Sequence, residues 1–232
     1  MSLSLASNSG QNLETDWNTL YRIGGVSALL VAIFIPLQII IFILYPPPST
    51  VLDWFTLFQN NRLIGLLDMD LLLIIDQFLF GLMILALYVK LRHNDQSLML
   101  IALMLSLMGI ITYFSSTVAF DMLTLSDKYA GASTEAEKTV LLTAGETMIT
   151  TWTGTAFDIG YILLGVSFLI IGFVMLYSSE FSKITAYLGI ITGIFSLIPA
   201  SFGIIGLLFA FISLIPMEFW IILIGKKFLT ST

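Results

Sequence analysis

Five acidic residues stand inside long apolar stretches of this sequence, where a charged side chain is costly. They are Asp68, Asp70, Asp76, Asp158 and Glu218. A carboxylate at the centre of a bilayer costs about 2.5–3.5 kcal/mol, and no lysine or arginine stands in the same stretches to pair with these acids. Each carboxyl group must therefore be protonated, accept hydrogen bonds, face a water-filled cavity or bind a cation.

The spacing of the acids suggests where they point. On a continuous helix at 100° per residue, Asp68 and Asp76 lie about 80° apart, while Asp70 and Gln77 share a second face. One hypothesis is an acidic cavity that holds a small cation, a proton or an amine. Its candidate residues are Asp68, Asp70, Asp76, Gln77 and Asp158. The alternative hypothesis is that the acids only hydrogen-bond to neighbouring helices and stabilise their packing.

Composition excludes most other kinds of site. The chain has no cysteine and one histidine, so it cannot form a disulfide, a cysteine-based metal site or a His-Glu-x-x-His zinc site. We expect no cofactor. No enzyme signature supports a catalytic function, although two aspartates on different helices would supply the carboxyl groups of an intramembrane diacid active site. A net charge of −6 with nine basic residues argues against a nucleic-acid partner.

The elements that position the acids are predicted to be membrane-spanning helices. Of the 232 residues, 58% are hydrophobic and only 10% are charged, whereas soluble domains carry roughly 25% charged residues. The apolar stretches are about 20 residues long, which suits a helix that crosses a bilayer. We predict an all-α integral membrane bundle over 23–225, between polar tails at 1–22 and 226–232. The six expected spans are about 23–45, 63–89, 97–120, 153–177, 184–201 and 203–225. The last two are expected to form a tight antiparallel hairpin, and a re-entrant pair is the alternative.

Basic residues predict the orientation of this bundle. With six spans, one side carries six of them: Arg22, Lys90, Arg92, Lys183, Lys226 and Lys227. The other side carries Arg62, Lys128 and Lys138. Because lysine and arginine are enriched in cytoplasmic loops, we expect a multi-pass protein of the cell membrane with both termini in the cytoplasm.

Two segments between spans are predicted to form helices of their own. Residues 49–61 suit a short helix at the outer interface. In the loop at about 121–152, Thr134 and Glu137 form a capping box, and a stripe with a spacing of four residues follows it. That stripe, which we expect to pack against the bundle or the membrane surface, contains Ala136, Val140, Ala144 and Met148. A Gly-xxx-Gly pair, Gly189 and Gly193, predicts close helix packing within the chain or in a homo-oligomer.

The sequence also resembles a known family. The resemblance is carried by Arg22-Ile23-Gly24-Gly25, Asp76, Leu87 to Arg92, Gly160-Tyr161, Gly165, Gly172, Tyr177-Ser178-Ser179 and Ala186-Tyr187-Leu188-Gly189. In these positions the chain is similar to a broad prokaryotic family of six-span membrane proteins known as a domain of unknown function. The resemblance implies the fold and the membrane location but no activity. Members often have histidine where this chain has Ser167, so a metal or proton-relay function of that histidine is not implied here.

These observations favour a non-enzymatic protein in the lipid bilayer, such as a small transporter or permease-like protein with an acidic intramembrane site. The alternative is a structural or regulatory membrane protein whose acids hold its helices together.

Overall fold

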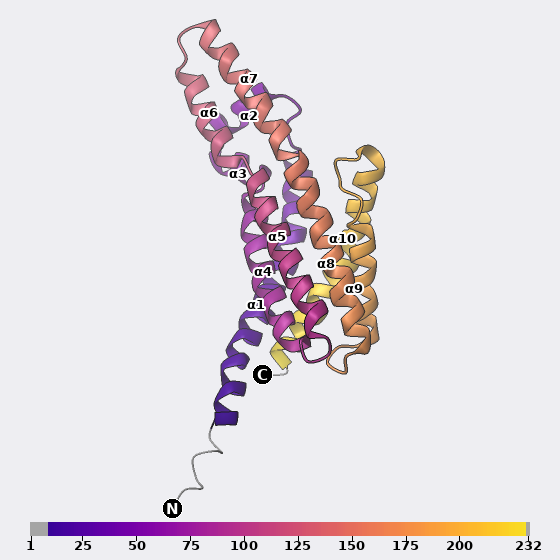
Figure 1. The fold of residues 1–232 in the computed structure, drawn as a ribbon. Coiled ribbons are helices and arrows are strands. Elements are labelled where there is room, and N and C mark those ends of the chain that lie inside the picture. The colour runs from indigo at the N-terminus through magenta and orange to yellow at the C-terminus, as the bar shows by residue number, and fades with distance from the viewer. Residues whose placement is uncertain (1–8, 231–232) are drawn as a thin grey trace, which may run out of the picture.

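Ten α-helices make up the computed structural model, which describes residues 9–230 (Figure 1). They are α1 (Ser9–Leu44), α2 (Val51–Asn60), α3 (Arg62–Asp68), α4 (Leu71–Leu91), α5 (Gln96–Ser116), α6 (Ala119–Gly131), α7 (Glu135–Trp152), α8 (Thr155–Tyr177), α9 (Lys183–Phe195) and α10 (Gly203–Thr230). No strand occurs between residues 9 and 230, and the all-α prediction is confirmed.

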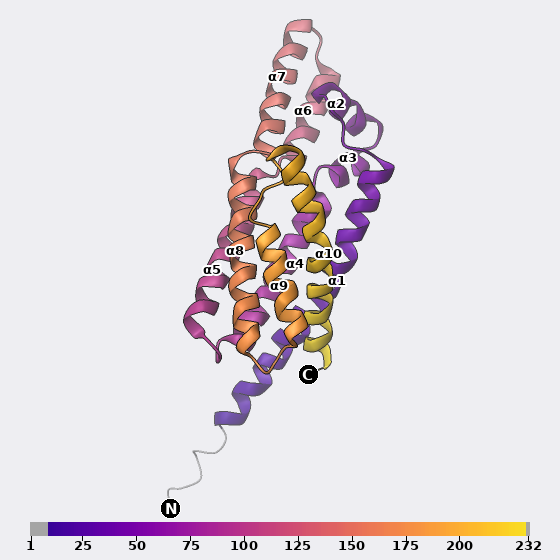
Figure 2. The same ribbon diagram turned by 90° about the vertical axis from the view of Figure 1, so that its right-hand side faces the viewer.

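The helices α1, α4, α5, α8, α9 and α10 form the main bundle. Each packs against the next in this order, and α10 packs back against α1. Fully buried side chains such as Met83, Trp220 and Phe228 fill the core. The first turns of α1 and the last turns of α10 lie at the same end of the bundle (Figures 1 and 2), which we call the proximal end.

Five helical segments in the described part of the chain are long and apolar enough to cross a membrane. They are Trp17–Leu44, Leu71–Leu91, Gln96–Gly131, Glu135–Tyr177 and Gly203–Thr230. Their surfaces expose large apolar side chains, such as Ile43, Ile111 and Ile204 at 70%, 66% and 78%. So large an exposed apolar surface is unfavourable in water. These helices therefore imply contact with lipid and fit a multi-pass membrane protein.

The span expected at 184–201 differs from the other five. The helix α9 has only 13 residues, which correspond to about 20 Å against roughly 30 Å of hydrocarbon. Residues 196–202 continue the chain as turns (Figure 2). Pro199 lacks a backbone N–H and disfavours helical geometry in the residue before it, so the helix stops short of it.

The span expected at 63–89 is broken rather than continuous. The helix α3 ends at Asp68, α4 begins at Leu71, and Asp70 between them has a left-handed backbone with φ 73°. Aspartate tolerates this conformation better than most residues. The angles derived from a straight helix therefore do not apply, because Asp68 and Asp70 do not share a helix with Asp76.

Helices α2, α3, α6 and α7 form a second unit, which we call the distal lobe. They pack against one another and have an apolar core of their own. The buried residues of this core include Val51, Trp54, Phe55, Phe58 and Met122. The α6–α7 hairpin extends beyond the main bundle, away from the proximal end (Figure 1).

The helix expected behind the capping box is present, but it packs with a different face. The box is complete, since Thr134 accepts a bond from the Glu137 N–H and Glu137 accepts one from the Thr134 N–H. Ala136 and Val140 are nevertheless exposed, while Gly145 is buried. On a helix of 3.6 residues per turn, side chains four residues apart differ in direction by about 40°. A stripe with this spacing therefore winds around the helix and does not stay on one face. The face that meets the lobe core therefore follows Leu142, Gly145, Met148, Ile149 and Trp152.

The Gly-xxx-Gly pair of α9 packs within the chain. A Cβ atom built on Gly193 would lie 2.8 Å from the Gly165 carbonyl oxygen, and one on Gly189 would lie 3.4 Å from the Gly172 Cα atom. Small residues on both helices thus bring α8 and α9 into backbone contact.

Candidate functional site

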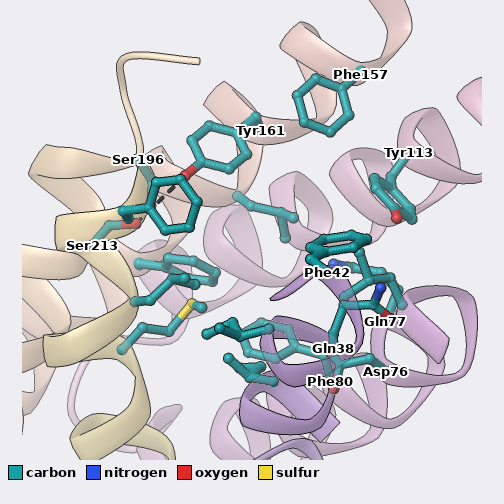
Figure 3. Close-up of a pocket in the computed structure, with 18 residues that line it drawn as sticks. Gln38, Phe42, Asp76, Gln77, Phe80, Tyr113, Phe157, Tyr161, Ser196 and Ser213 are labelled. Carbon is teal, nitrogen blue, oxygen red and sulfur yellow. Dashed lines mark hydrogen bonds between the residues drawn. The ribbon is translucent and has the colours of Figure 1, made fainter. Parts of the chain in front are cut away.

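A cavity of about 270 Å³ lies inside the main bundle (Figure 3). Its walls come from α1, α4, α5, α8, α10 and the residue that follows α9. They are formed by Ile35, Gln38, Ile39, Phe42, Leu73, Asp76, Gln77, Phe80, Tyr113, Phe157, Tyr161, Leu164, Phe168, Ser196, Phe211, Ser213, Leu214 and Met217. Most of these side chains are aromatic or aliphatic, and Asp76 is the one acid among them. No lysine or arginine is among these lining residues.

The Asp76 side chain lies at one end of the cavity, beside Gln77 and Gln38 (Figure 3). Asp76 is 5% exposed, and its Oδ1 atom has no hydrogen-bond partner among the described residues. The Gln77 Oε1 atom also lacks a partner in this part of the chain. Buried polar atoms normally have partners, so this end of the cavity offers acceptors that the protein itself does not satisfy.

Gln38 reaches this end from α1, two residues after the helix-interior Pro36. Its Nε2 atom donates a hydrogen bond to the Leu67 carbonyl of α3 at 3.1 Å. The bond holds the amide in one orientation, and the Gln38 Oε1 atom is left without a partner among the described side chains and backbone. Gln38 thus links the distal lobe to the wall of the cavity.

Hydroxyl groups mark the other end of the cavity. The Tyr161 hydroxyl of α8 lies 3.5 Å from Ser213 Oγ of α10 (Figure 3). Ser213 Oγ donates to the Ala210 carbonyl at 2.7 Å, which leaves its lone pairs free to accept. Ser196, the residue directly after α9, lines the same region. An occupant can therefore meet carboxylate and amide oxygens at one end, hydroxyl groups at the other and aromatic rings between them.

Asp70 lies behind this wall and does not line the cavity. It is 5% exposed, and the Trp152 indole N–H of α7 donates a hydrogen bond to its Oδ2 atom. Tyr113 lines the cavity and lies close to Asp70. Asp70 therefore joins the helix break to the distal lobe, and it has a partner that explains its burial.

The two remaining predicted acids lie elsewhere. Asp68 ends α3, is fully buried and has no hydrogen-bond partner on either oxygen among the described residues. Asp158 is in the first turn of α8 and accepts a hydrogen bond from the Ser201 hydroxyl. Of the five predicted site residues, the structure brings Asp76 and Gln77 to the cavity and leaves the other three outside its wall.

Glu218 is nearer to this site than its position in the sequence suggested. It lies two residues after Pro216 of α10, it interacts electrostatically with Asp76, and its Oε2 atom is buried without a partner in the described chain. It was not among the candidate site residues taken from the sequence. The cavity residues Tyr113, Ser196, Phe211 and Ser213 were also missed, because no spacing distinguishes them from other membrane residues.

The acids of the described chain do not gather into a metal site. No group of three or more histidine, aspartate or glutamate side chains is close enough to hold an ion among the side chains that the structure describes. Ser167, where family members often have histidine, is buried and donates a hydrogen bond to the Ala102 carbonyl at 2.8 Å. It also lies 2.6 Å from Ser106 Oγ. These bonds tie α8 to α5 and give Ser167 a structural function.

Comparison with known proteins gives one match. A family model described as a domain of unknown function, DUF4386, matches residues 19–225. No curated protein and no solved structure matches the chain.

Proposed function

The chain belongs to the DUF4386 family, and we propose that this member binds a small amphipathic amine in its intramembrane cavity, as a permease-like protein would.

In the proposed topology the chain crosses the membrane six times. The segment from α9 through residues 196–202 supplies the sixth crossing, since it connects the proximal end with the start of α10 near the opposite end of the bundle (Figure 2). An even number of crossings agrees with the start of α1 and the end of α10 at the same end. The proximal end carries Lys90, Arg92, Lys183 and Lys227. This excess of basic residues favours an orientation in the cell membrane in which the proximal end faces the cytoplasm. In this arrangement the distal lobe lies outside.

The proposed binding of an amine rests on one observation. The buried Asp76 carboxyl group has an oxygen without a partner among the described residues, and it lies at the wall of an aromatic cavity. A carboxylate in such surroundings needs a counter-charge or a hydrogen-bond donor. An alkylammonium group supplies both, and the rings of Phe42, Phe80 and Phe168 favour its apolar part and contact cations through their faces.

A metal cation is a weaker candidate for the same site. Calcium takes six to eight oxygen ligands and magnesium demands octahedral geometry, whereas Asp76 is the one carboxylate in the cavity wall. A bound proton alone would leave most of the apolar volume without an occupant. An organic amine uses the acid and the aromatic surface together.

A structural function is the better explanation for two of the other acids. Asp70 accepts the Trp152 indole N–H and Asp158 accepts the Ser201 hydroxyl. The first bond joins the break between α3 and α4 to α7, and the second joins α8 to the turn between α9 and α10. These acids therefore serve packing whether or not the cavity binds a ligand.

The test is binding of hexylamine by the purified protein in nanodiscs, followed by thermal unfolding. We expect hexylamine to raise the unfolding temperature and hexanol, which lacks the charge, to raise it much less. Asp76→Asn should abolish the difference between the two compounds, and Asp158→Asn, the matched control outside the cavity, should keep it. Equal responses to hexylamine and hexanol in the unmodified protein would overturn the proposal. Sodium, potassium and calcium salts serve as further probes, and stabilisation by one of them that Asp76→Asn removes would favour an inorganic cation instead.

A further inference from the structure

The helices α1 and α10 are close together at the proximal end and separate beyond it. Near that end, a Cβ atom built on Gly25 would lie 3.0 Å from the Phe228 Cβ atom, and one on Gly225 would lie 3.2 Å from the Ala28 Cβ atom. Figure 2 shows the two helices diverging toward the distal lobe.

Each of these helices contains a proline beside the cavity. Pro36 lies one residue after Ile35 of the cavity wall, and Pro216 lies one residue before Met217 of the same wall. Proline removes a hydrogen bond from the helix interior and kinks it. The two prolines therefore fall at the level of the cavity, between the tightly packed part of the helix pair and the part that diverges.

Phe211 lies in the diverging part of α10 and belongs to two surfaces at once. It lines the cavity, and it is 60% exposed on the outside of the bundle. Its neighbours Leu207 and Leu208 on α10 are 48% and 55% exposed, and Ile40 on α1 is 50% exposed. A residue that faces both the cavity and the lipid-facing surface marks the place where the two meet.

We infer that the cavity opens sideways into the bilayer between α1 and α10, and that its ligand is a membrane-dissolved amine with a single long alkyl chain. This inference rests on the proposed function and names the class of its ligand. The amine group binds at Asp76, and the chain passes Phe211 into the lipid. The cavity volume of about 270 Å³ is just below the range of about 300–1,000 Å³ for small-molecule pockets. It accommodates the head group and a few carbons, so a long chain needs the opening.

Two measurements test the opening. The first compares the unfolding temperature in nanodiscs with hexylamine, dodecylamine and octadecylamine at equal mole fraction in the lipid. With a lateral opening, octadecylamine stabilises the protein at least as well as hexylamine, because its chain remains in lipid. An enclosed cavity would instead reject the longer chains, and stabilisation by hexylamine alone would overturn the opening while the proposed function stands.

The second measurement uses the absence of cysteine in the chain. Phe211→Cys and the control Ile215→Cys, which is 64% exposed and does not line the cavity, are labelled with an alkyl maleimide dissolved in the bilayer. Octadecylamine should slow the labelling of position 211 at least several-fold and leave position 215 unchanged. The protection should disappear in Asp76→Asn/Phe211→Cys. Equal protection at both positions, or none at either, would overturn the opening, and failure of every amine to stabilise the protein would overturn the proposed function with it.

Discussion

The indole N–H of Trp152, the last residue of α7, donates a hydrogen bond to the carboxylate of Asp70 at the break between α3 and α4. The Trp152 ring also meets the Trp54 ring edge-on, with 5.8 Å between centroids. This side chain therefore links three helical elements through one polar and one aromatic contact.

The polar contact should contribute measurably to stability. Trp152→Phe retains an aromatic ring but leaves the buried Asp70 carboxylate without its donor, and we expect a loss of about 1.5–3 kcal/mol. Asp70→Asn keeps an oxygen that accepts the same bond and should cost less. The free energy of unfolding in detergent, measured for both single variants and the double variant, checks the coupling. Additive losses would show that the bond contributes little.

The left-handed backbone of Asp70 leads to a second prediction. Alanine and glycine at this position both lose the hydrogen bond, but only alanine carries the penalty of a left-handed backbone, about 1–2 kcal/mol. Asp70→Gly should therefore be more stable than Asp70→Ala by about 1 kcal/mol. The same unfolding measurement applies, and the opposite order would show that the break straightens when the aspartate is removed.

Gly145 of α7 lies in the core of the distal lobe. A Cβ atom at this position would collide with Val51 and lie 3.1 Å from Phe55. Alanine usually favours a helix over glycine by about 1 kcal/mol, but here we expect Gly145→Ala to destabilise the lobe by about 1–3 kcal/mol. Gly131→Ala is the control, since a Cβ atom there meets nothing within 4 Å. Hydrogen exchange of α2 and α7 amides checks the effect, which should be confined to the lobe.

An ion-pair network at the proximal end should stabilise the bundle modestly. Glu180 lies 3.0 Å from the Lys90 Nζ atom and 3.9 Å from that of Lys227, and the Lys90 side chain is only 18% exposed. Glu180→Gln leaves this lysine without its partner, and we expect a loss of up to about 1 kcal/mol. Glu135→Gln removes an exposed pair with Lys138 and should change nothing measurable. Equal effects of the two changes would argue against the network.

The proposed orientation predicts the accessibility of two exposed serines. Ser133 lies between α6 and α7, and Ser179 lies between α8 and α9 at the opposite end of the molecule. In intact cells, a membrane-impermeant thiol reagent should label Ser133→Cys and not Ser179→Cys. Both should react after the cells are permeabilised, and labelling of position 179 alone from outside would reverse the orientation.

Apolar stretches and helix-capping patterns in the sequence predicted much of the fold. Hydropathy alone identified the long helices, because a bilayer demands apolar length regardless of what the helices pack against. Thr134 and Glu137 identified the start of α7 for a local reason, since both partners of a capping box lie within one turn. The length of α9 was overestimated because Leu197 and Ile198 continue the apolar stretch while Pro199 ends the helix.

The candidate site was only partly predictable, because its geometry depends on contacts between distant helices. Asp76 and Gln77 line the cavity together because they are adjacent on α4. Asp70 was assigned to the same helix, since no proline or glycine lies within four residues of it. The partner that accompanies the break, Trp152, stands 82 residues away, and local spacing contains no information about such a pair.

The distal lobe also constrains the order in which the protein can be assembled. Its core joins α2 to α6 and α7, as in the bond of 2.9 Å from Ser126 Oγ to the Phe55 carbonyl, whose residues are 71 positions apart. During synthesis, α2 therefore emerges long before the helices that bury Trp54 and Phe58, while α4 and α5 enter the membrane. In that interval the aromatic face of α2 is without the contacts that bury it in the folded protein.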